Sequence, residues 1–170
     1  MTRWVGAALL LAGSSALGGG AVAQLRGRVR DLQGLTAGLE AMDRALSTSL
    51  APLDQMLQEA ETCAGQRPAQ FFRSCRKRIP DLDGRPFAQL WDKALGETPL
   101  RLDEADLTVL RQLGNVLGRY DSNSQAAALE QAVQRLSLHQ TEAEERQGRL
   151  GRVYGTLGVA CGLFLSIMLL

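Results

Sequence analysis

The side chains that could do acid–base or metal chemistry are few and far apart in this sequence. The single histidine is His139, and Cys63 and Cys75 form no CxxC motif or other metal-ligand spacing. No phosphate-binding loop of the GxxxxGK[ST] type is present. The acidic residues of Asp103–Asp106 suit a helix start better than acid–base catalysis. We therefore predict a protein that is not an enzyme, with no cofactor, no metal and no small-molecule substrate.

The densest positive charge is the run Arg73–Arg78, with the sequence RSCRKR. Two interpretations of it stay open. As the end of a helix, the run complements the negative end of the helix dipole. As a surface, Arg76, Lys77 and Arg78 are candidates for contact with an acidic partner or anionic lipid headgroups. The chain as a whole has 19 Lys+Arg and 18 Asp+Glu, and this balance argues against a nucleic-acid partner.

A second candidate surface is the segment 113–125, LGNVLGRYDSNSQ. Gly114 and Gly118 allow a neighbouring helix to approach closely, and Gly118 also suits a helix end. Asp121 and Gln125 are placed to satisfy backbone groups left open at a turn. The segment is therefore either a structural corner or a contact with another protein.

The spacing of apolar residues predicts helices throughout the middle of the chain. From Leu25 to Leu50 they recur every three or four residues, the stripe of an amphipathic helix. Proline and glycine divide the rest into further helices, and the clearest loop is 80–86, PDLDGRP. No segment favours a strand. We predict an all-α fold, an antiparallel bundle of about six helices.

Both ends of the chain lack charge, over Trp4–Ala23 and Val153–Leu170. At about 1.5 Å per residue, each stretch covers roughly 27–30 Å, enough to cross a bilayer. Arginines flank these stretches on their inner sides, which favours a cytoplasmic middle. We expect a two-pass protein of the cell membrane, whose first and last bundle helices continue into the membrane. Its parts are a transmembrane helix at 1–23, a cytoplasmic domain at 24–152 and a transmembrane helix at 153–170.

Two details of these ends allow alternatives. Ala21-Val22-Ala23 resembles a signal-peptide cleavage site, so the first stretch is either an anchor or a cleaved signal. The second stretch holds a ladder of glycines that lets helices pack closely in a bilayer. Its partner is either the first span or another subunit, and the ladder consists of Gly151, Gly155, Gly158 and Gly162.

The segment LGNVLGRYDSNSQ resembles a signature of the stage III sporulation protein AB family. Other features of that family follow in order: a proline-leucine segment at Ala51–Leu57, an aromatic pair at Phe71 and Phe72, and a tryptophan at Trp91. The sequence departs from the pattern at Arg119-Tyr120, before Asp121, where the family usually has a small residue. The resemblance covers nearly the whole chain, and it rests on the ordered set of features more than on any single motif.

The resemblance implies a mother-cell membrane protein required for endospore formation. It implies a non-enzymatic adaptor in the channel complex between mother cell and forespore. The implied partners are a stage III sporulation protein AA-like ATPase, other membrane subunits of the complex, and the lipid bilayer. The family's helical domain is similar to the F domain of type II secretion systems.

Two other functions are alternatives. One is an inner-membrane platform component of a type II secretion or type IV pilus-like system. Such platforms usually carry two copies of the domain, whereas this chain has one copy and no internal repeat. The other is an enzyme or sensor whose site is buried in the bundle, which would require a strongly perturbed cluster of ionisable groups.

Overall fold

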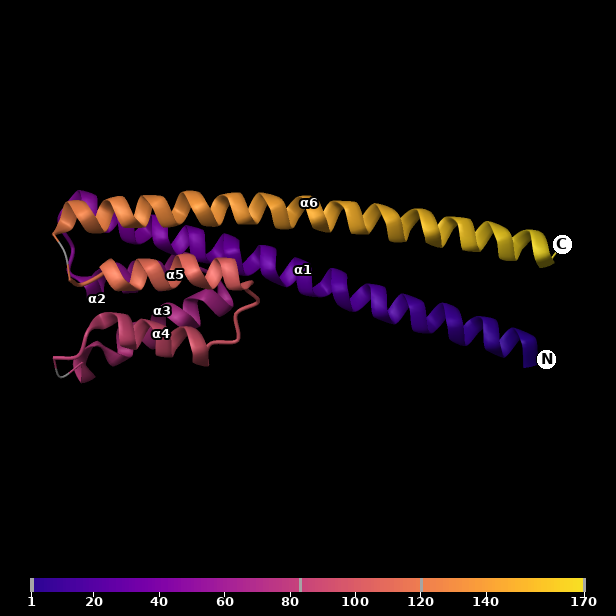
Figure 1. The fold of residues 1–170 in the computed structure, drawn as a ribbon, viewed down its shortest axis with the longest axis horizontal. Coiled ribbons are helices and arrows are strands. Elements are labelled where there is room, and N and C mark those ends of the chain that lie inside the picture. Colours follow the sequence, from indigo (N-terminus) through magenta and orange to yellow (C-terminus); the bar gives the residue numbers. More distant parts are fainter. Residues whose placement is uncertain (1, 83, 120, 170) are drawn as a thin grey trace. The chain divides into compact units, whose positions relative to one another are not determined.

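The structure, a computed structural model, describes residues 2–82, 84–119 and 121–169, and it describes side chains over 24–149 apart from 83 and 120. These residues form helices and no strand, which confirms the all-α prediction. The elements are α1 (Thr2–Ser49), α2 (Leu53–Cys63), α3 (Gln66–Arg78), the short 3₁₀ helix η1 (Ile79–Asp81), α4 (Phe87–Glu97), α5 (Glu104–Val116) and α6 (Ser122–Leu169). α1 and α6 run in opposite directions (Figure 1).

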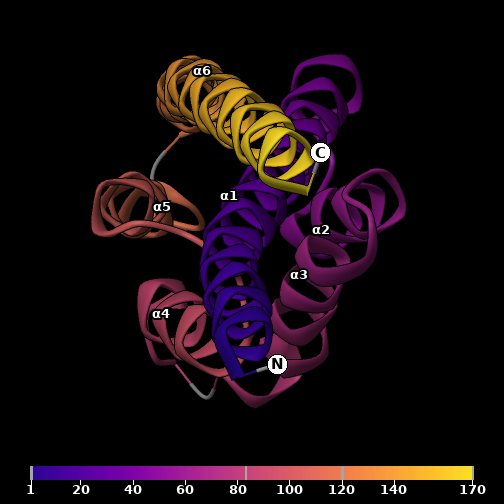
Figure 2. The same ribbon diagram turned by 90° about the vertical axis from the view of Figure 1, so that its right-hand side faces the viewer.

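The chain divides into two compact units. One unit consists of Met1–Gly27 and Glu142–Leu170, and in it the described residues belong to the outer ends of α1 and α6. The other unit, Arg28–Thr141, holds the remaining helices and is called the bundle below. In the end-on view of Figure 2, α4 and α5 lie on one side of the bundle and α2 and α3 on the other.

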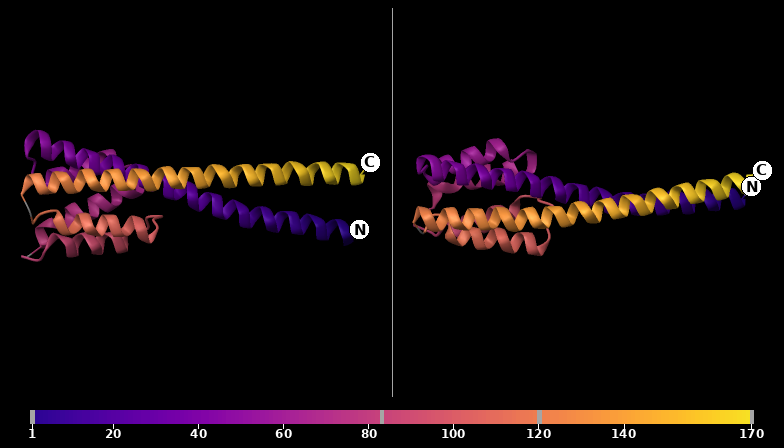
Figure 3. Two further views of the ribbon diagram at one scale, coloured as in Figure 1. Left: turned by 45° about the horizontal axis from the view of Figure 1, so that its top comes forward. Right: turned by 90° about the horizontal axis from the view of Figure 1, so that it is seen from above.

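Local sequence signals place most helix boundaries in the bundle. Pro52 precedes α2 and Pro86 precedes α4, where the missing amide hydrogen of proline costs no helical hydrogen bond. Asp103 is the N-cap of α5. Gly118 follows α5 with a φ of 75°, a left-handed conformation that glycine adopts without strain. Figure 3 shows from two other sides the short helices α2 to α5, which come after α1 and before α6 in the sequence.

Aromatic rings fill the centre of the bundle between α3 and α4. Phe71, Phe72 and Trp91 have no solvent exposure. The Phe71 and Trp91 rings meet edge to face, with 4.6 Å between centroids and 79° between planes, a favoured geometry for aromatic pairs. The indole nitrogen of Trp91 donates to the Leu110 carbonyl oxygen at 2.8 Å, so this large residue is buried with its polar atom satisfied.

Two glycines on α1 let the α2–α3 corner pack directly against its backbone. A Cβ at Gly34 would lie 2.1 Å from the Ala64 carbonyl oxygen, and one at Gly38 would lie 2.4 Å from the Phe72 ring. Their GxxxG spacing puts both on one helix face. This spacing is visible in the sequence, but neither glycine was among the predicted contacts.

The prediction of a two-pass membrane protein is contradicted. Along the part of the chain that the structure describes, no helix combines the length and the apolar character needed to cross a membrane. α1 and α6 each have 48 residues, but their described side chains include closely spaced charges, such as Arg28 and Arg30 in α1 and Glu145 and Arg146 in α6. The side chains of 1–23 and 153–170, where the two spans were predicted, lie outside the described residues.

Candidate functional site

The main cluster of charged side chains in the bundle is built around Asp106, in the first turn of α5. This side chain is fully buried. Arg28 of α1 donates from Nε to Asp106 Oδ2 at 2.9 Å and from Nη2 to Oδ1 at 3.1 Å. Such a two-pronged pairing uses the planar shapes of guanidinium and carboxylate together and is among the strongest polar contacts in proteins.

Two further donors complete the surroundings of Asp106. The backbone N–H of Asp103 donates to Oδ2 at 2.9 Å, which forms part of a capping box at the start of α5. His139 of α6 lies with Nδ1 2.8 Å from Oδ1. Because an ionised carboxylate only accepts, Nδ1 of His139 carries the hydrogen. Each Asp106 oxygen therefore accepts two hydrogen bonds, which is the full capacity of a carboxylate.

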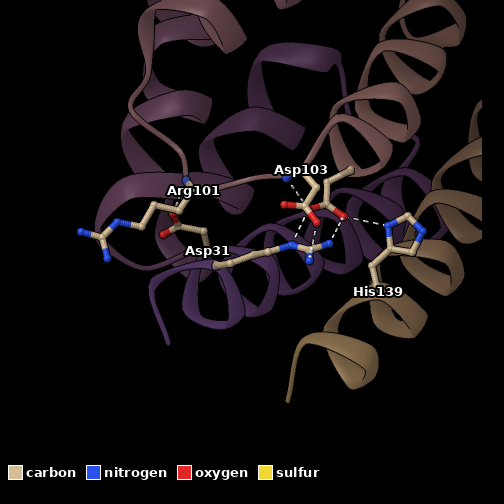
Figure 4. A network of polar contacts seen from close by, with 6 residues as sticks. Asp31, Arg101, Asp103 and His139 are labelled. Atoms are coloured by element: carbon tan, nitrogen blue, oxygen red, sulfur yellow. Dashed lines mark hydrogen bonds and ion pairs between the residues drawn. The ribbon is translucent and has the colours of Figure 1, made fainter. Parts of the chain in front are cut away.

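A second buried carboxylate lies one helical turn along α1 from Arg28. Asp31 is buried, accepts from the backbone N–H of Arg101 at 2.8 Å, and pairs with Arg67 Nε at 3.2 Å. Figure 4 shows these polar contacts, with Asp31 and Arg101 beside Asp103 and with His139 on the far side of the network. The two carboxylates thus attach the segment before α5 and the start of α5 itself to one face of α1.

The ionisation of Asp106 reflects competing effects. Burial by itself raises the pKa of this carboxyl group. The hydrogen bonds from Arg28 and the Asp103 N–H, the positive charge of Arg28 and the contact with His139 outweigh burial, so the pKa of Asp106 lies below its usual value. The charged form is therefore the stable one in the folded chain.

The chemistry that this cluster allows is limited, because Asp106 is buried and already fully hydrogen-bonded. An arginine, a carboxylate and a histidine are common in acid–base sites. Asp106, however, has no exposed surface and no unused lone pair for a substrate. The arrangement suits a structural link between α1, α5 and α6. Among the described residues, no group of histidine, cysteine, aspartate and glutamate could hold a metal ion.

The predicted basic surface Arg76, Lys77 and Arg78 lies at the end of α3, and most of its charge is paired within the chain. Arg76 bonds Glu61 at 3.1 Å, and Arg78 pairs with Glu97 of α4 and donates to Ser74. Lys77 is exposed. Glu61 also accepts from Arg73 at 2.6 Å, and this bond is the main reason that the pKa of Glu61 is lowered. Contact of this surface with a partner stays a prediction.

The predicted surface at 113–125 forms the corner between α5 and α6. Gly114 is buried, and a Cβ there would lie 2.5 Å from Trp91 Cδ1, so the close helix approach predicted for it is within this chain. Asp121 caps α6 by accepting from Ser124 N at 3.2 Å and Ser124 Oγ at 2.8 Å. Gln125 Oε1 accepts from the Gly118 N–H at 3.4 Å. A partner contact at this corner stays a prediction.

The other predicted contacts are outside the described side chains. They are the glycines of the ladder, Gly151, Gly155, Gly158 and Gly162.

Cys63 and Cys75 are both free, the first exposed and the second buried.

The sequence analysis missed the link between Arg28, Asp106 and His139. Asp106 was predicted at a helix start, and the structure confirms this position, but nothing in the sequence pattern indicated that its side chain is buried. Arg28 and Asp31 are three residues apart on a helix that also carries a buried apolar stripe, and this pattern was the available signal.

Comparison with known proteins places these features in a family. The family model described as stage III sporulation protein AB matches residues 3–170. A curated relative, stage III sporulation protein AB of Bacillus subtilis (strain 168), is 24% identical over 145 residues, which cover 84% of each chain. A solved structure of stage III sporulation protein AB superposes with a TM-score of 0.64 and 23% identity, over 72% of this chain and 98% of the other.

At this identity, the superposition supports the helical fold alone. The family model, in contrast, extends over almost every residue of the sequence, including the charged cluster and the corner at 113–125. The chain belongs to the stage III sporulation protein AB family.

Proposed function

We propose that this protein is a non-enzymatic adaptor of the channel complex of sporulation, and that it couples an ATPase of the stage III sporulation protein AA type to other subunits. Family membership supports the role in sporulation. The binding surfaces are assigned to residues 24–152. The observation that carries the non-enzymatic assignment is the saturation of Asp106 by donors of the same chain.

A catalytic alternative would use the same cluster. A general acid or base needs an atom within hydrogen-bond reach of the substrate. Asp106 has none, and Arg28 is largely buried, with 11% of its side chain exposed. These contacts favour an architectural role for the cluster, which fixes the helices that present the outer surface.

The relation to the F domain of type II secretion systems stays a prediction. A platform component of such a system is the alternative function. The single copy of the domain favours the adaptor, because platform proteins usually carry two copies.

The coupling is tested by affinity purification of the full chain mixed with the AA-type ATPase. We expect the two proteins to elute together at low ionic strength and less so at high salt, because salt screens contacts between exposed charges. Resin without the chain is the control for non-specific retention. Recovery of the ATPase in the flow-through at low salt, with a folded chain on the resin, would refute the coupling.

A further inference from the structure

A hollow on the bundle surface gathers positive charge that the chain does not neutralise. It lies at the junction of α3, η1 and α4 and has a volume of about 390 Å³. Among the described residues that line it, Asp81 is the one carboxylate. The lining residues include Arg78, Arg85 and Lys93, with Leu82, Pro86 and Leu90 between them.

The cations of this hollow differ in how much of their charge is free. Arg78 is paired with Glu97. Arg85 is exposed and donates from Nη2 to the Asp81 carbonyl oxygen at 3.0 Å, which leaves most of its five N–H donors for another group. Lys93 is exposed, and within the described residues no hydrogen bond or ion pair involves it. Arg85 and Lys93 therefore carry the available charge.

The run Arg73–Arg78 has the densest positive charge in the sequence, but ion pairs within the chain engage three of its four cations. In that run, Arg73 and Arg76 share the single carboxylate of Glu61, which balances one of their two charges, and Arg78 pairs with Glu97. Arg85 comes from the loop after η1 and Lys93 from α4, eight positions later. Only the fold places them around one hollow with Arg78.

Backbone hydrogen bonds hold the main chain at Arg85. The Leu82 N–H donates to Ile79 at 3.2 Å, and the Arg85 N–H donates to Leu82 at 2.7 Å. Gly84 has a φ of 79°, which allows the chain to reverse without strain. The main chain of Arg85 is therefore held by backbone hydrogen bonds beside the hollow.

We propose that this hollow binds an acidic segment of a partner protein, with apolar side chains between its carboxylates. The cations of the hollow would pair with the carboxylates of the segment, and Leu82, Pro86 and Leu90 would pack against its apolar side chains. The carboxylate of Asp81 disfavours a compact, highly charged anion such as free phosphate. The inference rests on the proposed adaptor function, because it assigns the surface through which the chain meets a partner.

The probe is a short fluorescent peptide in which glutamate and leucine alternate, added to the full chain at low salt. The test variant is Arg85→Glu with Lys93→Glu, and the matched control is Arg44→Glu with Arg119→Glu, which changes net charge equally at exposed positions elsewhere. We expect the test variant to bind about tenfold more weakly and the control to stay within about twofold of the original chain. Circular dichroism checks that both variants remain helical.

Several results would overturn the proposal: no binding of the peptide to the original chain, an equal loss in the control, or binding to anionic lipid vesicles in place of the peptide. The AA-type ATPase provides a separate readout. If the ATPase binds the test variant and the control equally well, the adaptor function stands and this hollow is not its contact. If the original chain binds the peptide at this hollow but not the ATPase, the adaptor function fails and the acidic-segment site stands.

Discussion

Arg28 and Asp106 form a two-pronged ion pair between residues 78 positions apart in the chain. The pair links α1 to the first turn of α5, and neither side chain is more than 11% exposed. The pairing offsets the cost of removing both charges from water only while both partners are present. The predictions below follow from this pair and from the packing around it.

Replacing Asp106 with asparagine is expected to lower the free energy of unfolding by about 3 kcal/mol, because Arg28 then loses its buried counter-charge and keeps only the half-exposed Asp103, 2.6 Å from its Nη1. Urea denaturation of the full chain measures the change. The matched control is Glu104→Gln, two residues away in the same helix turn. Glu104 pairs with Arg111, but both are exposed, so the loss should stay below about 1 kcal/mol. Equal losses in the two variants would contradict the assigned importance of the buried pair.

Ionisation of Asp106 makes the free energy of unfolding depend on pH. The pKa of Asp106 is lowered in the folded chain, whereas in the unfolded chain it is expected near 3.9. Its contribution is therefore fully present above the unfolded pKa and is lost as the pH falls through the lower, folded pKa. Urea denaturation of the original chain and Asp106→Asn should differ most near about pH 6 and converge toward about pH 2. A difference that stays constant over this range would show that ionisation of Asp106 does not contribute.

Replacing His139 with alanine should cost about 1–2 kcal/mol of unfolding free energy, because it removes one hydrogen bond to a buried, charged oxygen. The loss is smaller than for Asp106→Asn, since Arg28 and the Asp103 N–H still hold the carboxylate. Leu138→Ala is the control in the same helix, because Leu138 is 66% exposed. If the two alanine variants unfold at the same urea concentration, the His139 contact contributes nothing.

Gly114→Ala is expected to destabilise the chain by about 1–3 kcal/mol, because the new methyl group would meet the buried Trp91 ring. The opposite sign is expected for Gly96→Ala in α4. No atom lies within 4 Å of a Cβ at Gly96, so this change should stabilise the helix by about 0.5–1 kcal/mol. Thermal unfolding followed by circular dichroism compares the two. A stabilising Gly114→Ala change would mean that α4 and α5 are not in close contact at this point.

The described cysteines should differ in reactivity. Cys75 is buried, and burial raises the pKa of its thiol, whereas Cys63 is exposed. In a Cys161→Ser background, Ellman's reagent should modify Cys63 rapidly and Cys75 only after unfolding in urea, because the thiolate is the reactive form. Rapid modification of Cys75 in the folded chain would contradict the packing of α3.

The bundle helices could be predicted from the sequence because their signals are local. The stripe from Leu25 to Leu50, the proline before α2 and the carboxylates at the start of α5 act within one or two helix turns. The resemblance carried by 113–125 led to the correct family for the same reason, since an ordered set of short features survives in the chain itself. The membrane spans were inferred from the missing charges of the two ends alone, and the structure contradicts that inference.

The charged contacts could not be predicted, because they depend on which helices meet. Nothing local joins Arg28 to Asp106 or His139, and nothing local shows that Arg73 and Arg76 both bond Glu61 while Arg85 and Lys93 line a hollow on the surface. The sequence by itself determined the helical class, the helix starts and the family. The tertiary structure decided which charges are buried in pairs and which face outward, because an ion pair needs atoms within a few ångströms and only packing brings distant residues that close.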